Sequence, residues 1–291
     1  MIERPTRGST RSGAACPRRV GLVDREDALI TIGVAEWVLE RRGPAALDRA
    51  AQLGLGAIHV DAGAPGRRYH VGERAVRRAY REVASVTGVA IVGLSAGAVD
   101  AIGVLGPRTG LATRRCRDVV RGASDAAAEL GAPIVCVPSV RRSEIRSADD
   151  LARTAEFLRE ACEHAEKNDV GLATKNTLGG SGNRALFAAV GHPRLSLLVD
   201  PHDAARAGHD PAELVELMAE RLCGLVHVQH GRDPATPAPL LGEGDAPLRE
   251  TLEALVAARF SGHVILANDY TVDAKQRVER DLEALGTIFG T

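Results

Sequence analysis

The fold is decided by a stretch of sequence that occurs twice, as AAQLGLGAIHV at residues 50–60 and as AAELGAPIVCV at residues 127–137. In both copies the end of a helix is followed by a glycine that stops it and then by a short apolar run. A strand that is apolar throughout is typical of a parallel sheet, because helices cover both faces of such a sheet. The stretch therefore predicts a helix-to-strand unit that repeats along the chain.

The same alternation extends over the rest of the chain. The expected strands are Ile30–Glu36, Ala57–Asp61, Val89–Leu94, Ile134–Pro138, Val170–Lys175, Ser196–Asp200, Gly224–Gln229 and His263–Asn268. The expected amphipathic helices are Leu47–Leu53, Arg74–Val86, Cys116–Leu130, Asp149–Lys167, Pro211–Arg221, Pro247–Arg259 and Val272–Leu285. Eight such units predict an α/β protein with one domain, a (β/α)₈ TIM barrel over residues 28–291. Residues 1–27 are expected to be an irregular N-terminal tail or extension.

A doubly wound open sheet is the alternative architecture. That fold is expected to have about six strands and a glycine-rich phosphate loop after the first of them. Residues 35–38, which end the first predicted strand and follow it, contain no glycine. The barrel is therefore preferred.

The composition excludes several classes of partner. The chain has 291 residues, 37 Lys and Arg against 38 Asp and Glu, and only one Trp, three Tyr and four Phe. A neutral chain with few aromatic side chains offers neither the basic surface nor the stacking platforms of a nucleic-acid-binding protein. No apolar run is long enough to span a membrane, and the five cysteines form neither a CxxC pair nor a disulfide framework. We therefore expect a cytoplasmic protein without nucleic-acid or membrane partners.

Polar side chains stand at the ends of the predicted strands. In a TIM barrel these C-terminal strand ends meet at one face, and that face holds the active site. The residues concerned are Glu36, Asp61, Ser95, Ser139, Lys175, Asp200, His202, His227, Gln229, Asn268 and Asp269.

One of these residues stands out because of the composition. Only three of the 37 Lys and Arg residues are lysines, so arginine is the default cation of this chain. Lys167 and Lys275 fall on predicted helices, where a charge is ordinary. Lys175 ends the fifth predicted strand, and a lysine in this place needs a specific explanation.

The chain resembles the xylose isomerase-like TIM barrels, the sugar isomerase/epimerase superfamily that also includes endonuclease IV. The resemblance covers residues 30–285 and is carried by LGxxxIxV junctions, LVDPH at 198–202, VHVQ at 226–229 and GEGD at 242–245. Members of that superfamily hold one divalent metal ion with a Glu ending strand five, an Asp ending strand six, a His on strand seven and a Glu ending strand eight. Such an ion (Mn, Mg, Co or Zn) polarises a substrate carbonyl while a carboxylate moves a proton.

Two of these four ligand positions depart from the family pattern. The resemblance places Asp200 and His227 at the retained positions, but Lys175 stands where the family reads ALEN, and Asn268 replaces the last Glu. A protonated lysine cannot bind a metal ion and puts a positive charge where the ion would sit. We therefore expect no metal cofactor, with Lys175 paired to Asp200 in place of the ion. A divalent metal held by Asp200, His202 and His227 is the less favoured alternative.

Three functions are compatible with such a centre. The preferred one is a metal-independent isomerase or epimerase acting on a small polar carbonyl or sugar-like compound. Lys175 would stabilise an enediolate in it, with Asp200, His202 or His227 as acid and base. The second is a Schiff-base lyase or aldolase that uses Lys175 as a nucleophilic amine. The third is a relative without catalytic activity that binds a ligand or a partner. An endonuclease is not expected, because Lys175 and Asn268 break the metal cluster that this branch needs.

Substrate-binding side chains are expected at the same strand ends: Glu36, Asp61, Arg141, Gln229, His230 and Asn268. Structural explanations stand beside the functional ones. Lys175 could bridge Asp200 or Asp203 and hold the barrel end together, and His227 could be a core histidine. The glycine-rich turn at Gly179–Asn183 could bind a phosphate with help from Arg184, or could simply start a helix. The resemblance also implies a dimer or tetramer.

Overall fold

The computed structural model describes residues 21–25, 28–230, 239–244 and 247–289, with side chains described from residue 30 onward. Asp245 of the GEGD stretch and most of residues 1–27 lie outside the described residues.

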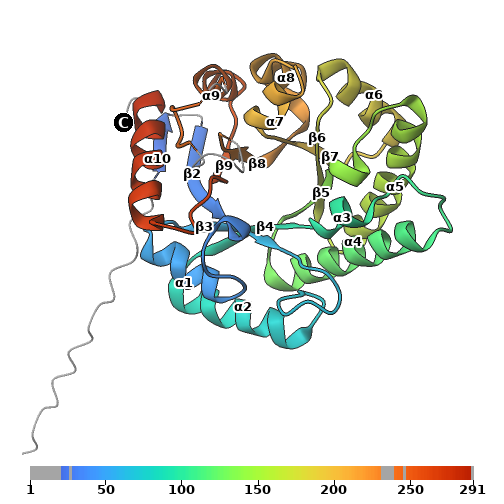
Figure 1. The fold of residues 1–291 in the computed structure, drawn as a ribbon, viewed down its shortest axis with the longest axis horizontal. Coiled ribbons are helices and arrows are strands. Elements are labelled where there is room, and N and C mark those ends of the chain that lie inside the picture. The colour runs from blue at the N-terminus through green and yellow to red at the C-terminus, as the bar shows by residue number, and fades with distance from the viewer. Residues whose placement is uncertain (1–20, 26–27, 231–238, 245–246, 290–291) are drawn as a thin grey trace, which may run out of the picture.

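Eight parallel strands close into a barrel (Figure 1). They are β2 (Ala28–Ala35), β3 (Ala57–Asp61), β4 (Ala90–Ser95), β5 (Ile134–Ser139), β6 (Gly171–Asn176), β7 (Leu195–Val199), β8 (Leu222–Val228) and β9 (Gly262–Leu266). Each strand pairs with the next one, and β2 pairs with β9 to close the sheet on itself. The predicted TIM barrel is confirmed.

Helices surround the barrel and follow its strands. The outer helices are α1 (Ala45–Gln52), α2 (Arg74–Thr87), α4 (Leu111–Leu130), α5 (Ala148–Lys167), α6 (Gly180–Val190), α8 (Pro211–Leu217), α9 (Leu248–Ala257) and α10 (Ala274–Phe289). Two short helices, α3 (Ala98–Ile102) and α7 (Pro201–Arg206), lie inside this ring (Figure 1). Single 3-10 turns are η1 (Glu36–Val38), η2 (Arg141–Ser143) and η3 (Ala219–Arg221). Among the described helices, none combines the length and the apolar character needed to cross a membrane.

The repeated stretch folds as the sequence predicts. Helix α4 ends at Gly131, whose φ of 71° is the left-handed conformation that glycine adopts without strain. Its N–H group donates to the carbonyls of the last helical turn, and β5 begins three residues later. Strand β5 is buried along its whole length, as expected for a strand covered on both faces.

The main difference from the predicted organisation lies near the N-terminus. Residues Gly21–Arg25 form a strand, β1, that pairs antiparallel with β2. Part of the segment 1–27, expected to be an irregular tail, therefore extends the sheet by one strand outside the closed barrel.

Candidate functional site

A buried ion cluster lies at the C-terminal ends of β6 and β7. The Lys175 Nζ atom lies 2.6 Å from Oδ2 of Asp200 and 2.9 Å from Oδ2 of Asp203. The side chain of Asp200 is 1% exposed and that of Lys175 is 15% exposed. Gln229, at the end of β8, donates a third hydrogen bond from Nε2 to Oδ2 of Asp200 at 2.6 Å. The expected ion pair between Lys175 and Asp200 is present, and Asp203 is a second partner.

The local sequence explains why Asp200 and Asp203 face the same lysine. Strand β7 ends at Val199, and Pro201 occupies the first turn of α7, where its missing N–H group costs nothing. Asp200 caps this helix, because its Oδ1 accepts a hydrogen bond from the N–H of Asp203 at 3.2 Å. His202 lies in the first turn of α7, so it does not share a strand face with Asp200, as the alternative metal set would require.

The charges in the cluster fix the protonation state of its lysine. Burial alone would lower the pKa of Lys175, but the charges of Asp200 and Asp203 outweigh it and raise the pKa above its ordinary value. In the same way, Lys175 lowers the pKa of Asp203 although burial opposes this. Lys175 is thus an ammonium ion at neutral pH. An ammonium ion stabilises negative charge but is not a nucleophile, which argues against the Schiff-base alternative.

A second polar cluster lies inside the barrel. Nδ1 of His59, on β3, is 2.9 Å from Nε2 of His227, on β8, so one imidazole donates a hydrogen bond to the other. The ring of Trp37 lies against both, with centroid distances of 5.2 Å to His59 and 5.6 Å to His227. Burial lowers the pKa of His59 to about 4 and that of His227 well below its ordinary value. Both imidazoles are therefore neutral at pH 7.

This neutral histidine pair predicts a pH dependence of stability. A buried histidine with a lowered pKa stabilises the fold above the unfolded-state pKa of about 6.5 and loses this contribution as the pH falls toward about 4. The unfolding free energy of the unmodified chain falls when the pH is lowered from 7 to 5. In His59→Gln this fall is expected to be about 2 kcal/mol smaller. Urea unfolding of both proteins at the two pH values measures this difference. Equal losses in the two proteins would show that folding does not lower the pKa of His59.

Asn268 belongs to a buried network that faces away from the ion cluster. Its Oδ1 accepts a hydrogen bond from the N–H of His230 at 2.9 Å, and its Nδ2 donates to Oδ2 of Asp281, on α10, at 2.8 Å. Asp281 also accepts hydrogen bonds from the Tyr270 hydroxyl at 2.5 Å and from the N–H of Leu241 at 2.8 Å. The network ties the end of β9 to α10 and to the segment after β8.

The remaining predicted substrate-binding residues occupy different environments. Glu36 is buried, and its carboxylate accepts hydrogen bonds from the N–H groups of Gly43 and Asp61, at 2.6 and 3.0 Å, and from the Tyr80 hydroxyl, at 2.9 Å. Asp61 is half-buried at the end of β3, and burial raises the pKa of its carboxyl. Arg141 is exposed in the turn η2 after β5.

These contacts leave a poor set of donors for a divalent metal ion. Lys175 occupies Asp200, Nε2 of His227 faces His59, and both polar atoms of Asn268 are used in its own network. Across the described part of the chain, no three His, Cys, Asp or Glu side chains are grouped as metal ligands. The alternative set of Asp200, His202 and His227 is thus not assembled, and the residues present do not fit a metal ion.

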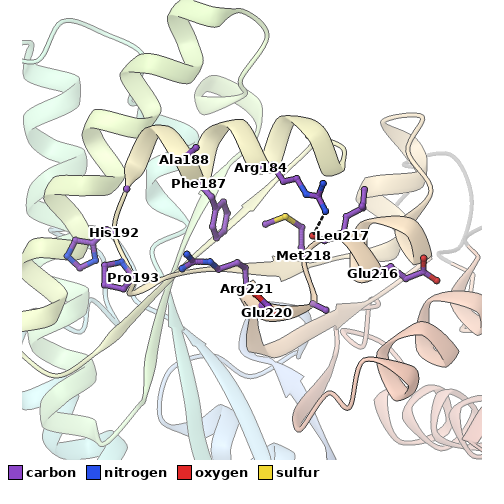
Figure 2. Close-up of a pocket in the computed structure, with 12 residues that line it drawn as sticks. Arg184, Phe187, Ala188, His192, Pro193, Glu216, Leu217, Met218, Glu220 and Arg221 are labelled. Atoms are coloured by element: carbon purple, nitrogen blue, oxygen red, sulfur yellow. Dashed lines mark hydrogen bonds between the residues drawn. The ribbon is translucent and has the colours of Figure 1, made fainter.

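A hollow of about 870 Å³ lies away from these clusters, outside the barrel (Figure 2). It runs between α6 and the segment 216–221, and its lining includes Phe187, Met218 and the loop that leads into β7. Arg184 lines this hollow and donates a hydrogen bond to the carbonyl of Leu217 at 3.4 Å. We place the site at the strand ends, because the ion cluster lies there and the hollow lies near the opposite ends of the strands.

Sequence reasoning missed two features near the strand ends, the contact between His59 and His227 and the position of Asp100 beside the end of β5. Nothing in the local sequence of His59 points to His227, 168 residues away. Asp100 lies in α3, five residues beyond the end of β4, and so escapes a search of strand ends. A search of the short helices that directly follow predicted strands would have included Asp100.

The chain was compared with known proteins. Residues 47–288 match the family described as xylose isomerase-like TIM barrels. A 2-epi-5-epi-valiolone 7-phosphate 2-epimerase of an Actinoplanes species is 34% identical over 253 residues, which cover 87% of this chain and 92% of the relative.

Solved structures show the same fold at low identity. An L-ribulose 3-epimerase superposes with a TM-score of 0.72 at 16% identity, covering 89% of this chain and 94% of the other. A 3-keto-D-glucoside 4-epimerase from E. coli superposes with a TM-score of 0.69 at 14% identity, covering 89% and 99%. The family match and the Actinoplanes relative together cover most of the sequence, and the chain belongs to the xylose isomerase-like TIM barrel family.

Proposed function

We propose that this chain is an epimerase that inverts a carbon next to the carbonyl of a phosphorylated, polyhydroxylated ring compound, with the Lys175 ammonium in place of a divalent metal ion. The chain is an isomerase- or epimerase-like enzyme. Support for the substrate class comes from the Actinoplanes relative, whose name describes inversion at carbon 2 of a valiolone 7-phosphate.

The observation that carries the proposal is the pair of contacts from Lys175 to Asp200 and Asp203. In the enzymes that this chain resembles, a doubly charged ion faces two Glu and one Asp, which gives a formal charge of −1. Here the same positions carry one ammonium, one carboxylate and the neutral His227 and Asn268, which gives 0, and Asp203 adds a second carboxylate beside Lys175. The positive charge at the centre is thus part of a side chain and is balanced by carboxylates that it contacts.

The proposed chemistry needs a positive group beside the substrate carbonyl. Removal of a proton from the carbon next to a carbonyl moves negative charge onto the carbonyl oxygen, and a positive group close by lowers the energy of that state. Lys175 is held by two carboxylates and by the barrel strands, so it needs little rearrangement to take this role. Asp200 binds Lys175 directly, and Gln229 holds Asp200 in place. Both residues are expected to position the ammonium and not to contact the substrate themselves.

The expected result of metal removal tests the proposal. We expect the chain to convert 2-epi-5-epi-valiolone 7-phosphate to its carbon-2 epimer, detected by NMR, because the charge that a metal would supply is already part of the chain. Treatment with EDTA is expected to change the rate less than twofold, and adding Mn²⁺, Co²⁺, Mg²⁺ or Zn²⁺ is expected to give no increase.

Two outcomes would contradict different parts of the proposal. If EDTA abolishes the reaction and one of the metal ions restores it, the enzyme is a metal-dependent epimerase. If borohydride in the presence of the substrate adds stable mass to Lys175, the reaction is covalent and Lys175 reacts as an amine.

A further inference from the structure

We infer that Asp100 and Asp61 are the two acid/base residues of the site, one on each side of the carbon that is inverted. This inference rests on the proposed function and extends it, because the proposal assigns the positive group but not the side chains that move the proton.

The position of Asp100 places its carboxyl one strand away from Lys175. Its Oδ1 accepts a hydrogen bond from the N–H of Val140 at 3.2 Å, directly after β5. In the register between β5 and β6, Pro138 lies beside Lys175. Helix α3, which carries Asp100, lies inside the ring of long helices with α7, which carries Asp203 (Figure 1). Asp100 therefore belongs to the same edge of the barrel as the ion cluster.

Asp61 lies on the other side of β4. It ends β3 beside Ser95 of β4, and its Oδ1 is 3.7 Å from where a Cβ atom of Gly97, the residue before α3, would lie. Strands two places apart in a sheet are separated by about 10 Å. The end of β4 and the start of α3 lie between the β3 and β5 ends, so the two carboxyls lie on either side of the residues that lead from β4 into α3.

The hydrogen bonds and ion pairs distinguish these two carboxyls from those of Glu36, Asp200 and Asp203. Both oxygens of Glu36 and of Asp200 accept hydrogen bonds from the protein, and Asp203 is paired with Lys175. Within the described residues, Asp61 and Asp100 each use only Oδ1, and neither forms an ion pair. Each therefore keeps one oxygen for a substrate.

The charges around Asp100 suit proton transfer near neutral pH. Burial raises the pKa of Asp100 to about 6, although Arg141 of η2 and Lys175 of β6 act against this; Asp203 of α7 adds to it. Burial likewise raises the pKa of Asp61, which Arg42 counteracts. A carboxyl in this range gives up and takes back a proton easily at physiological pH.

The step balances with these two groups and the substrate alone. The Asp100 carboxylate takes the proton from the carbon next to the carbonyl. The C–H electron pair forms a carbon–carbon double bond, and the carbonyl π electrons move to the oxygen, whose negative charge Lys175 stabilises. The protonated Asp61 then gives its proton to the opposite face of the same carbon, and the carbonyl re-forms. Asp61 ends as a carboxylate and Asp100 as an acid, and exchange with solvent resets both; the reverse reaction exchanges their roles.

The test uses both epimers of 2-epi-5-epi-valiolone 7-phosphate in D₂O, followed by NMR. The unmodified chain is expected to invert each epimer and to incorporate one deuterium at that carbon. Asp100→Asn keeps the acceptor for Val140 and is expected to lower inversion at least 100-fold, the lower range of a lost general acid or base. In Asp100→Asn only Asp61 can still remove a proton, so deuterium is expected to enter only the epimer whose proton faces Asp61. In Asp61→Asn deuterium is expected to enter only the other epimer. Replacing a residue with a purely structural role would lower deuterium exchange into both epimers alike.

The controls separate the inference from the proposed function. Asp118→Asn changes an exposed carboxylate on α4 and is expected to match the unmodified chain. If Asp100→Asn does not fold, Asp100→Glu is the second variant, because it keeps a carboxylate. For the unmodified chain and for Asp100→Glu, kcat/KM is expected to rise with pH through about pH 6, where the carboxyl becomes ionised. An Asp100→Asn protein that inverts within threefold of the unmodified chain, or exchanges both epimers, overturns the inference alone. An unmodified chain that neither inverts nor exchanges overturns the proposed function and this inference together.

Discussion

Replacing Lys175 by methionine is expected to lower kcat about 10²- to 10³-fold, the range seen when one preorganised group that stabilises the transition state is removed. The methionine side chain has a similar length but no charge, so the enolate oxygen loses its positive partner. Steady-state kinetics by NMR or a coupled assay measures the loss. Lys275→Met is a matched control, because the side chain of Lys275 is 75% exposed on α10 and its ion pair with Glu279 of the same helix is long, at 3.7 Å.

The same substitution separates catalysis from folding. Removing Lys175 leaves Asp200 and Asp203 facing each other in a buried site, and breaking a buried pair in this way costs about 3–5 kcal/mol. The double variant Lys175→Met/Asp200→Asn removes one of these charges and is expected to regain part of that stability without regaining activity. A Lys175→Met protein that keeps full activity would contradict the role given to the ammonium.

Replacing Asp281 by alanine is expected to have a large effect on stability. The side chain accepts hydrogen bonds from Leu241, Asn268 and Tyr270, and its removal leaves three buried donors without an acceptor. At about 1–3 kcal/mol for each buried donor, a loss of at least about 3 kcal/mol in unfolding free energy is expected. Urea unfolding measures it.

The control for this prediction lies on the same helix. Glu283 is exposed on α10, and Glu283→Ala is expected to change the unfolding free energy by less than about 0.5 kcal/mol. If Asp281→Ala loses as little as Glu283→Ala, water or a rearranged neighbour satisfies the three donors.

The fold and the centre of the site could be predicted from local sequence. The repeated unit at residues 50–60 and 127–137 carries its own stop signal and its own buried strand, so eight copies of this pattern define a barrel without knowledge of any tertiary contact. The ion pair was predictable for a related reason. Lys175 and Asp200 end neighbouring strands of a parallel sheet, and such ends meet at one edge.

The other contacts depend on packing across the barrel and were not predictable in this way. An apolar strand such as Ala57–Asp61 gives no sign that its single histidine meets another from β8. Asn268 lies two residues beyond the end of β9 and not in the strand as predicted, and its partner Asp281 lies on the helix that follows, α10. A residue at a strand end has several polar neighbours. The one that it binds is determined by side-chain geometry, which a periodic sequence pattern does not contain.

The contact between His59 and His227 also has a consequence for biosynthesis. It joins residues 168 positions apart, and Gln229, which completes the ion cluster, follows on the same late strand. A growing chain that has not yet reached β8 therefore has His59 without its partner and Asp200 without one of its three donors. On such a chain the histidine pair cannot form and the ion cluster lacks Gln229, and the last strand, β9, is still required to pair with the open edge of β2. Proteolytic fragments or prematurely terminated products of this chain are accordingly expected to expose unpaired strand edges and to be recognised by chaperones instead of retaining partial activity.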